Sequence, residues 1–246
     1  MTLVEGIIVA LGGLASGFIN TLAGGGSAIT LPVLTELIGP NAANGTNRVA
    51  IQLANIAALG KFARGGAVPW RSVLPLVPAA MVGAGFGAWT ATLLSPGATR
   101  RVFAFVLVFV AASVLVRPSR WVEGREAVLP MPWRHVIFLA IGFYGGFVQA
   151  GVGFLLLAGL VLGSGLDLVK GNGAKVLIIA AYTPVALAFF VAAAQVDLGV
   201  GAVLSVGQVT GAWVAAHLAL RRGAGFVRWI LVAAALVAAG RMLLTA

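Results

Sequence analysis

Long apolar stretches, separated by short polar ones, run through the whole chain. In the first half they cover residues 5–23, 27–38, 43–63, 72–94 and 101–116. Within each stretch the apolar residues are continuous rather than alternating, which predicts helices and disfavours the strands of a membrane β-barrel. The stretch of residues 27–38 would rise only about 18 Å as a helix, which is too short to cross a bilayer. We therefore expect an all-α polytopic membrane protein.

The second half repeats this order of stretches. The first begins near His135, the second ends near Gly163, and the remaining three cover residues 174–194, 198–220 and 227–244. Glycines, a tryptophan and a basic residue recur at matching places in the two halves. We predict two repeats, each made of a broken or re-entrant helix pair followed by three spanning helices. The predicted divisions are a first repeat at residues 1–117, a polar linker at residues 118–134 and a second repeat at residues 135–246.

The basic residues predict how the repeats are oriented. If the helix pair makes no net crossing, each repeat crosses three times, and the second repeat is inverted relative to the first. Twelve of the 16 lysines and arginines would then lie on one face of the membrane. Because cytoplasmic loops are rich in such residues, this face is predicted to be cytoplasmic and both termini to lie outside.

Composition narrows the class of protein further. The chain is 61% hydrophobic and 9% charged, and its mean hydropathy is +1.07, which excludes an ordinary soluble domain. A net charge of +10 could indicate nucleic acid, but the basic residues lie in short loops, where they set topology and contact anionic lipid. There is no cysteine, and two scattered histidines without clustered carboxylates do not predict a metal site or another cofactor.

A glycine run interrupts the first apolar region and is the first candidate for a binding site. A helix that begins at Ser27, with Ser27 as its N-cap, would point free N–H groups at an anion, and the preceding glycines would let a ligand approach the backbone. A weaker copy follows in the second half, and an amide side chain flanks each break. Tight helix packing is the alternative role of these glycines, and helix–helix hydrogen bonding that of the amides. The candidate binding residues are Asn20, Gly24, Gly25, Gly26 and Ser27 at the first break and Gln149, Gly151 and Gly153 at the second.

Two basic residues follow these breaks at matching places. Arg48 and Lys175 are predicted near the N-terminal ends of their helices, where the helix dipole disfavours a cation. A nearby anion would explain them, and a guanidinium can bind an oxyanion through two hydrogen bonds. The alternative is that both side chains reach the membrane interface from a helix end. Thr46, Asn47 and Asn172 lie beside them and complete the candidate site.

Further polar and aromatic residues could extend this lining. Gln52 and Asn55 lie on nearly the same helix face as Arg48, and Tyr182 matches Asn55 in the second repeat. Trp89 and Trp213 also match one another and could wall a substrate cavity. Packing or anchoring at the interface is the commoner role of tryptophan.

Few side chains could couple transport to protons. Glu36 and Asp167 lie at or near the ends of the short second segments and are the candidates. Their alternative role is that of ordinary residues in interfacial loops. Catalytic motifs are missing from the sequence, so an enzyme is disfavoured, although a hydrolase built from a serine and a histidine on separate helices is left open.

These motifs resemble those of the TauE/SafE sulfite exporter family. The resemblance rests on Asn20 to Ser27, Leu31-Pro32 and Asn44 to Asn47, with Gly151 to Phe154 and Gly171 to Gly173 as the second copy. It implies a bacterial inner-membrane secondary carrier, often an exporter, of small sulfur-containing anions such as sulfite, thiosulfate or short sulfonates. The second copy has Phe154 where the first has Ser27, so the two breaks are not equivalent.

Together these observations predict a transporter that moves a small sulfur-containing anion by alternating access. A passive channel and a carrier of another small anion, such as a carboxylate, remain alternatives, and a membrane-embedded enzyme is a third. The expected partners are the anion, the lipid bilayer and a coupling proton, without nucleic acid. Neither the oligomeric state nor the direction of transport follows from the sequence.

Overall fold

The computed structural model describes residues 1–114 and 129–245, and every element in these ranges is a helix. The first half contains α1 (Leu3–Leu22), α2 (Ser27–Ile38), α3 (Pro40–Arg64), α4 (Trp70–Val73), η1 (Leu74–Leu76), α5 (Val77–Thr92) and α6 (Pro96–Val114). The second half contains α7 (Met131–Phe147), α8 (Val152–Ala158), the π-helical turn η3 (Gly159–Gly163), α9 (Leu168–Ala192) and α10 (Leu198–Thr245).

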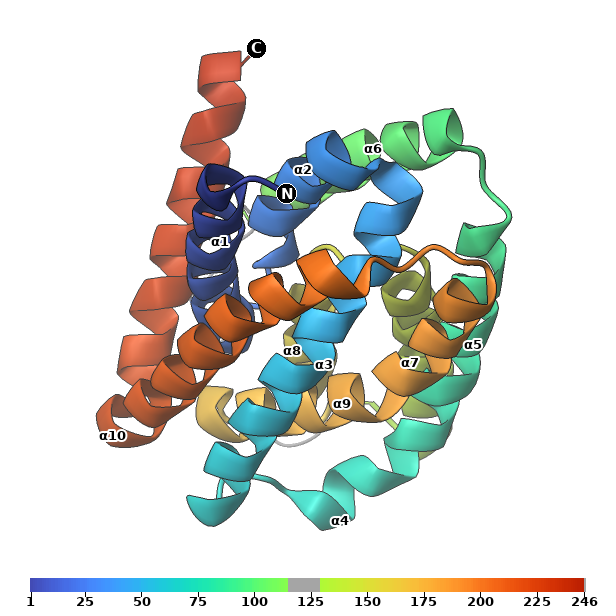
Figure 1. Cartoon of the computed structure of the whole chain (residues 1–246). Helices are drawn as coiled ribbons and strands as arrows, with labels where there is room; N and C mark the ends of the chain where they lie inside the picture. Colours follow the sequence, from blue (N-terminus) through green and yellow to red (C-terminus); the bar gives the residue numbers. More distant parts are fainter. Residues whose placement is uncertain (115–128, 246) are drawn as a thin grey trace.

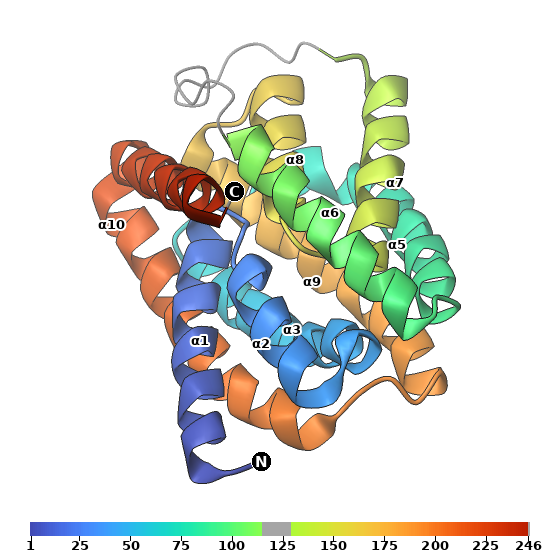
Figure 2. The same ribbon diagram turned by 90° about the horizontal axis from the view of Figure 1, so that it is seen from above.

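Two helix hairpins form where the sequence predicts broken or re-entrant pairs. The chain leaves α1 through Gly24, which has a φ of +91°, and α2 returns along α1 (Figures 1 and 2). In the second half α7 ends before Gly151, which has a φ of +73°, and α8 turns back beside α7 (Figure 2). Glycine adopts such positive φ values at little cost, so it suits both turns.

Four of the described helical segments are long and apolar enough to cross a bilayer. They are Leu3–Leu22, Trp70–Thr92, Leu168–Ala192 and Leu198–Ile230. Helix α3 has 25 residues and is equally long, but amide, hydroxyl and basic residues lower its hydropathy. The all-α, multi-pass membrane class is confirmed, whereas the inversion of the repeats stays a prediction.

The helices pack through matching glycine contacts in the two halves. Helix α1 packs along the first part of α10, and α7 packs along α5, so each hairpin leans on a helix of the other half. A Cβ atom on any of these glycines would overlap the backbone of the opposing helix, so the glycines permit the close approach. The glycines are Gly13, Gly17, Gly207 and Gly211 in the first contact and Gly83, Gly87, Gly142 and Gly146 in the second. The contacts support the predicted duplication.

Long helices α3 and α9 cross at the centre of the molecule (Figure 1). They begin after the two hairpins and contact one another, so polar residues near their starts face the helix breaks of both halves. This crossing positions the candidate site.

Several predicted boundaries differ from the structure. The predicted stretch of residues 72–94 is divided into α4, η1 and α5, and α10 joins two predicted helices across a kink at Gly223, where φ is +71°. Helix α7 begins at Met131, inside the predicted linker, whose residues 118–128 lie outside the described ranges. Ser27 is the first residue of α2 rather than its cap, because Gly26 holds the cap position without a side-chain hydrogen bond.

Candidate substrate-binding site

Arg48 lies fully buried in the centre of the molecule, and its exposed fraction is 0%. Its guanidinium donates hydrogen bonds to the carbonyls of Gly145, at 3.0 Å, and Gly146. It also donates to the Oδ1 atom of Asn44 at 3.2 Å, and it lies over the ring of Phe190 at 4.5 Å from the ring centre. An arginine of α3 therefore binds the end of α7, in the other half of the chain.

Lys175 occupies the equivalent position in the second half and is also 0% exposed. Its Nζ atom donates hydrogen bonds to the carbonyls of Asn20 and Thr21, both at 2.8 Å, and to Oδ1 of Asn172 at 2.7 Å. Asn172 in turn donates from Nδ2 to the carbonyl of Leu22 at 3.2 Å. A lysine of α9 therefore binds the end of α1.

The two arrangements have the same plan. The last three carbonyls of α1 and of α7 have no partner within their own helix, and each set accepts hydrogen bonds from one asparagine and one basic residue of the opposite half. In α7 the asparagine is Asn44, whose Nδ2 donates to the carbonyl of Phe147 at 2.8 Å. We call this pair of contacts the crossed caps.

The crossed caps correct one argument drawn from the sequence. Arg48 is the ninth residue of α3 and Lys175 the eighth of α9, so both lie about two turns inside their helices rather than at the N-terminal ends. Each side chain faces the carboxyl end of another helix, where the partial negative charge of the helix dipole favours a cation. No anion is needed to explain these positions, and neither side chain reaches the surface of the protein.

Charge balance still leaves the centre positive. Among the described residues, no carboxylate lies within ion-pair distance of Arg48 or Lys175, and the single ion pair found there joins Lys170 to Asp167. A helix end contributes roughly half a negative charge, so each crossed cap offsets only about half of its cation. The two buried basic side chains therefore have only partial charge compensation, about two turns inside α3 and α9.

The two glycine breaks touch one another. Gly24 and Gly153 lie in backbone contact, and a Cβ atom on either would overlap the other. The ring of Phe154 covers Gly25, and Gly26 lies against α1. The space between the breaks is thus closed by glycine backbone and by one aromatic ring, rather than forming an open polar hollow.

Gln149 stands out among the residues of the second break. It has a φ of +68°, which is unfavourable for a residue with a side chain, and it is 2% exposed. Neither polar atom of its side-chain amide has a hydrogen-bond partner. Strain and unsatisfied polar atoms at one buried residue are typical of functional positions.

Asn47 joins three helices at the first break. Its Oδ1 accepts hydrogen bonds from Thr30 of α2 at 2.9 Å and from Gln208 of α10 at 3.2 Å, and its Nδ2 donates to Ser27 at 3.3 Å. Thr46, its neighbour, points elsewhere and accepts a hydrogen bond from the backbone of Asp197 at 2.8 Å. Asn47 and Ser27 are therefore part of one hydrogen-bonded group, while Thr46 links α3 to the segment that precedes α10.

The predicted extensions of the lining are scattered. Gln52 donates to the carbonyl of Ala180 at 3.2 Å, and Asn55 bonds to the carbonyl of Ile51 in its own helix. Tyr182 is fully buried against Gly145, and its hydroxyl has no hydrogen-bond partner. Only Tyr182 thus lies beside a crossed cap.

Both matched tryptophans lie on the outside. Trp89 and Trp213 are each 49% exposed, so they do not wall a buried cavity as the sequence suggested. Trp213 stacks on His217, and the Nζ atom of Lys61 lies 5.0 Å from its ring centre. Their positions agree with packing against lipid or the membrane interface.

Neither acidic candidate lies at the buried cations. Glu36 is exposed near the end of α2. Asp167 is the N-cap of α9, where it accepts hydrogen bonds from the backbone N–H groups of Val169 and Lys170 at 2.9 Å. Capping explains Asp167 without proton coupling. The described residues also contain no group of three histidines or carboxylates that could hold a metal ion.

Three buried polar residues near the first break were missed from the sequence. Ser16, Thr30 and Gln208 lie within apolar helices and have no local motif. Comparison of the repeats contains a usable signal for two of them, because the positions that match Thr30 and Gln208 in the other half are Leu157 and Ala84. A polar residue present in only one of two repeats is a candidate for function.

The sequence of this chain is similar to those of known proteins. Residues 9–242 match the family described as sulfite exporter TauE/SafE. The chain belongs to the TauE/SafE family. It is 28% identical over 230 residues to the probable membrane transporter protein ORF9 of a Sinorhizobium species, covering 93% of this chain and 88% of the relative.

Other relatives of this TauE/SafE protein carry the same description. It is 26% identical over 230 residues to the probable membrane transporter protein YfcA of Escherichia coli K12, covering 93% of this chain and 86% of that one. It is 24% identical over 222 residues to a probable membrane transporter protein of Haemophilus influenzae, covering 89% and 87%. No solved structure matches the chain. The protein is therefore a membrane transporter rather than an enzyme, with a small-molecule substrate, and it fits a multi-pass protein of the bacterial inner membrane.

Proposed function

We propose that this transporter carries a small sulfur-containing anion, such as sulfite, thiosulfate or a short sulfonate, by alternating access. The proposal rests above all on one observation: Arg48 and Lys175 are fully buried with no carboxylate partner among the described residues. Such charges are costly inside a membrane and mark substrate pathways. The excess positive charge favours an anion over a neutral or cationic substrate.

Helix arrangement supports the alternating-access part of the proposal. Each crossed cap links a hairpin of one half to the long helix of the other, and the two halves meet at the backbone contact of Gly24 with Gly153. Transporters built from repeats bind substrate at broken helices between the repeats and open alternately by rocking one part against another. A glycine contact without side chains suits such relative movement.

The sulfur chemistry of the substrate comes from the family and from the kind of groups present. The family is named for sulfite export. Backbone N–H groups, hydroxyls, amides and an arginine are donors that bind tetrahedral or pyramidal oxyanions. An exclusively apolar substrate would leave these groups unsatisfied.

Flux into proteoliposomes tests the proposal. We expect saturable uptake of sulfite, thiosulfate or sulfoacetate, with sulfate and acetate as competitors, and exchange accelerated by substrate on the opposite side. Non-saturating flux without this exchange would indicate a channel, and preference for acetate a carboxylate carrier. Liposomes without any anion flux would contradict the proposal.

Paired variants test whether the buried charges of Arg48 and Lys175 take part in substrate transport. Arg48→Gln and Lys175→Gln should each reduce uptake at least about tenfold, because each removes a charged hydrogen-bond donor. The controls are Arg64→Gln and Lys170→Gln, which change exposed basic residues on the same two helices. Equal uptake in all four variants would show that the buried charges do not serve substrate.

A further inference from the structure

A group of amide and hydroxyl side chains near the first break has hydrogen-bonding capacity that the protein does not use. We call it the amide–hydroxyl cluster. Its members are Ser16, Ser27, Thr30, Asn47 and Gln208, all buried. Asn47 bonds to Ser27, Thr30 and Gln208, but Oε1 of Gln208 and the hydroxyl of Ser16 have no partner.

Backbone contacts place Ser16 beside the rest of the cluster. Its carbonyl touches Gly26, which precedes Ser27, and the next residue, Gly17, packs on the backbone of Gln208. Ser16 therefore lies between the start of α2 and the Gln208 turn of α10. Buried polar atoms are nearly always paired, so the two unpaired oxygens of Ser16 and Gln208 indicate a missing partner.

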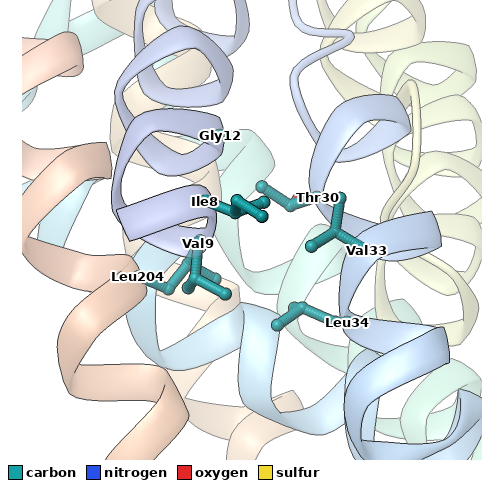
Figure 3. Close-up of a pocket in the computed structure, with 7 residues that line it drawn as sticks. All are labelled: Ile8, Val9, Gly12, Thr30, Val33, Leu34 and Leu204. Carbon is teal, nitrogen blue, oxygen red and sulfur yellow. The ribbon is translucent and has the colours of Figure 1, made fainter. Parts of the chain in front are cut away.

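An apolar pocket lies next to the cluster (Figure 3). Between α1, α2 and α10 it has a volume of about 10 Å³, which is room for about one water molecule, so the pocket is nearly closed in this conformation. Thr30 belongs to both the pocket and the cluster, while Gly12 and Leu204 lie one helical turn from Ser16 and Gln208. The lining residues are Ile8, Val9, Gly12, Thr30, Val33, Leu34 and Leu204.

We infer that the substrate anion binds the amide–hydroxyl cluster at the start of α2 and enters on the side of this pocket when the pocket widens during transport. This rests on the proposed function and assigns Ser16, Thr30 and Gln208 to its site. The hydroxyls of Ser16 and Ser27 and the second N–H of the Asn47 and Gln208 amides can donate to the anion. The hydroxyl of Thr30 donates to Asn47 instead, and the N–H groups of Ala28 and Ile29 donate to the carbonyls of Gly25 and Gly26. Oε1 of Gln208 accepts from a protonated oxygen or water bound with the anion.

The positive charge of the crossed caps acts on the same place. Lys175 binds the carbonyl of Asn20, one turn along α1 from Ser16, and Arg48 follows Asn47 in α3. Neutral groups of the cluster hold the anion, while the two cations, occupied by helix ends, supply attraction at longer range. This division explains how buried charges can serve both the fold and the substrate.

Ser16→Ala is the sharpest test, because the serine hydroxyl makes no hydrogen bond within the protein. We expect the KM for the best-carried anion of the flux series to rise about tenfold, as after loss of one hydrogen bond to a charged group. Melting of the ligand-free protein should be unchanged or occur at a higher temperature. Gln208→Leu should show the same rise in KM. The control Ser205→Ala removes a buried hydroxyl of α10 that bonds only within its own helix.

Gly12→Val tests the entry route. A Cβ atom on Gly12 meets no neighbour within 4 Å, so valine would narrow the pocket without straining the helix contact. We expect uptake to fall several-fold with unchanged melting, whereas the control Gly60→Val, another helical glycine with open space around it, keeps the wild-type rate.

The outcomes separate this inference from the proposed function. Wild-type transport with a KM unchanged in Ser16→Ala would overturn the inference alone, even if Gln208→Leu failed to fold. Normal uptake by Gly12→Val would overturn the pocket as entry route. A wild-type protein that carries no anion would overturn the proposed function and this inference together.

Discussion

The two helix breaks share their supporting contacts but differ in the side chains that surround them. At both, an asparagine and a basic residue of the opposite half bind the last three carbonyls of the interrupted helix. At the first break, hydroxyl and amide residues follow, whereas the second has apolar residues at the matching positions. Ser27, Thr30 and Asn47 correspond to Phe154, Leu157 and Ala174.

The shared and the differing parts suggest different roles. Crossed caps satisfy backbone groups that every interrupted helix in a membrane must pair, so both halves need them. The amide–hydroxyl cluster satisfies no such general need, and part of it is unpaired. We therefore expect substitutions at the crossed caps to impair both fold and transport, whereas Ser16→Ala in the cluster should impair transport alone.

The largest effect on stability is expected where the two breaks touch. Gly24→Ala adds a Cβ atom that overlaps Gly153 and also places alanine at a φ of +91°. The unfavourable φ costs about 1–2 kcal/mol, and overpacking costs about 1–3 kcal/mol. We expect the free energy of unfolding in detergent to fall by about 2–5 kcal/mol.

Two further variants separate these contributions. Gly153→Ala introduces the overlap without a positive φ, and Gly66→Ala introduces a residue at a φ of +67° where a Cβ meets nothing within 4 Å. Their losses should add up to that of Gly24→Ala. A loss for Gly24→Ala no greater than that for Gly66→Ala would contradict the contact between the breaks.

The crossed caps should give the next largest effect, and it should appear in the opposite half. Arg48→Met leaves the carbonyls of Gly145 and Gly146 without a donor, and Lys175→Met does the same for Asn20 and Thr21. Buried acceptors without partners cost about 1–3 kcal/mol each, partly offset by removal of the buried charge, so we expect a net loss of about 2–4 kcal/mol.

Hydrogen exchange locates this effect. Exchange should quicken at the end of α7 in Arg48→Met and at the end of α1 in Lys175→Met, because those helix ends lose their caps. Arg64→Met and Lys170→Met, at exposed positions of the same helices, should change neither. Faster exchange confined to the mutated helix would contradict the crossed arrangement.

Local sequence signals predicted much of the fold. The bounds of α2 follow from the glycine run before Ser27 and from Gly39-Pro40 after it, and the structure has the helix at Ser27–Ile38. Continuous apolar stretches predicted the membrane class. The resemblance of the glycine and asparagine motifs to the TauE/SafE family was also confirmed.

Contacts between distant residues could not be predicted in this way. Arg48 and Gly145 are 97 residues apart, so the sequence showed an unexplained cation but not the helix end that it binds. The positions of Arg48 and Lys175 along their own helices suggested an unfavourable interaction with the helix dipole. In the structure each side chain faces the carboxyl end of another helix, whose dipole favours a cation. Gln208 was missed for the same reason, since its partner Asn47 lies 161 residues away.

The smallest predicted effect concerns the strained residue of the second break and has the opposite sign. Gln149→Gly relieves a φ of +68° and removes two unpaired buried polar atoms, so it should stabilise the protein by about 1 kcal/mol. Ala194→Gly is the control, because Ala194 has a φ of +55° in an exposed position between α9 and α10. Both variants should melt at a higher temperature, measured without substrate. If Gln149 contacts the anion, only Gln149→Gly should also lose uptake in proteoliposomes. Equal gains in stability with full uptake in both would restrict substrate binding to the first break, since the strain at Gln149 would then serve only to turn the chain.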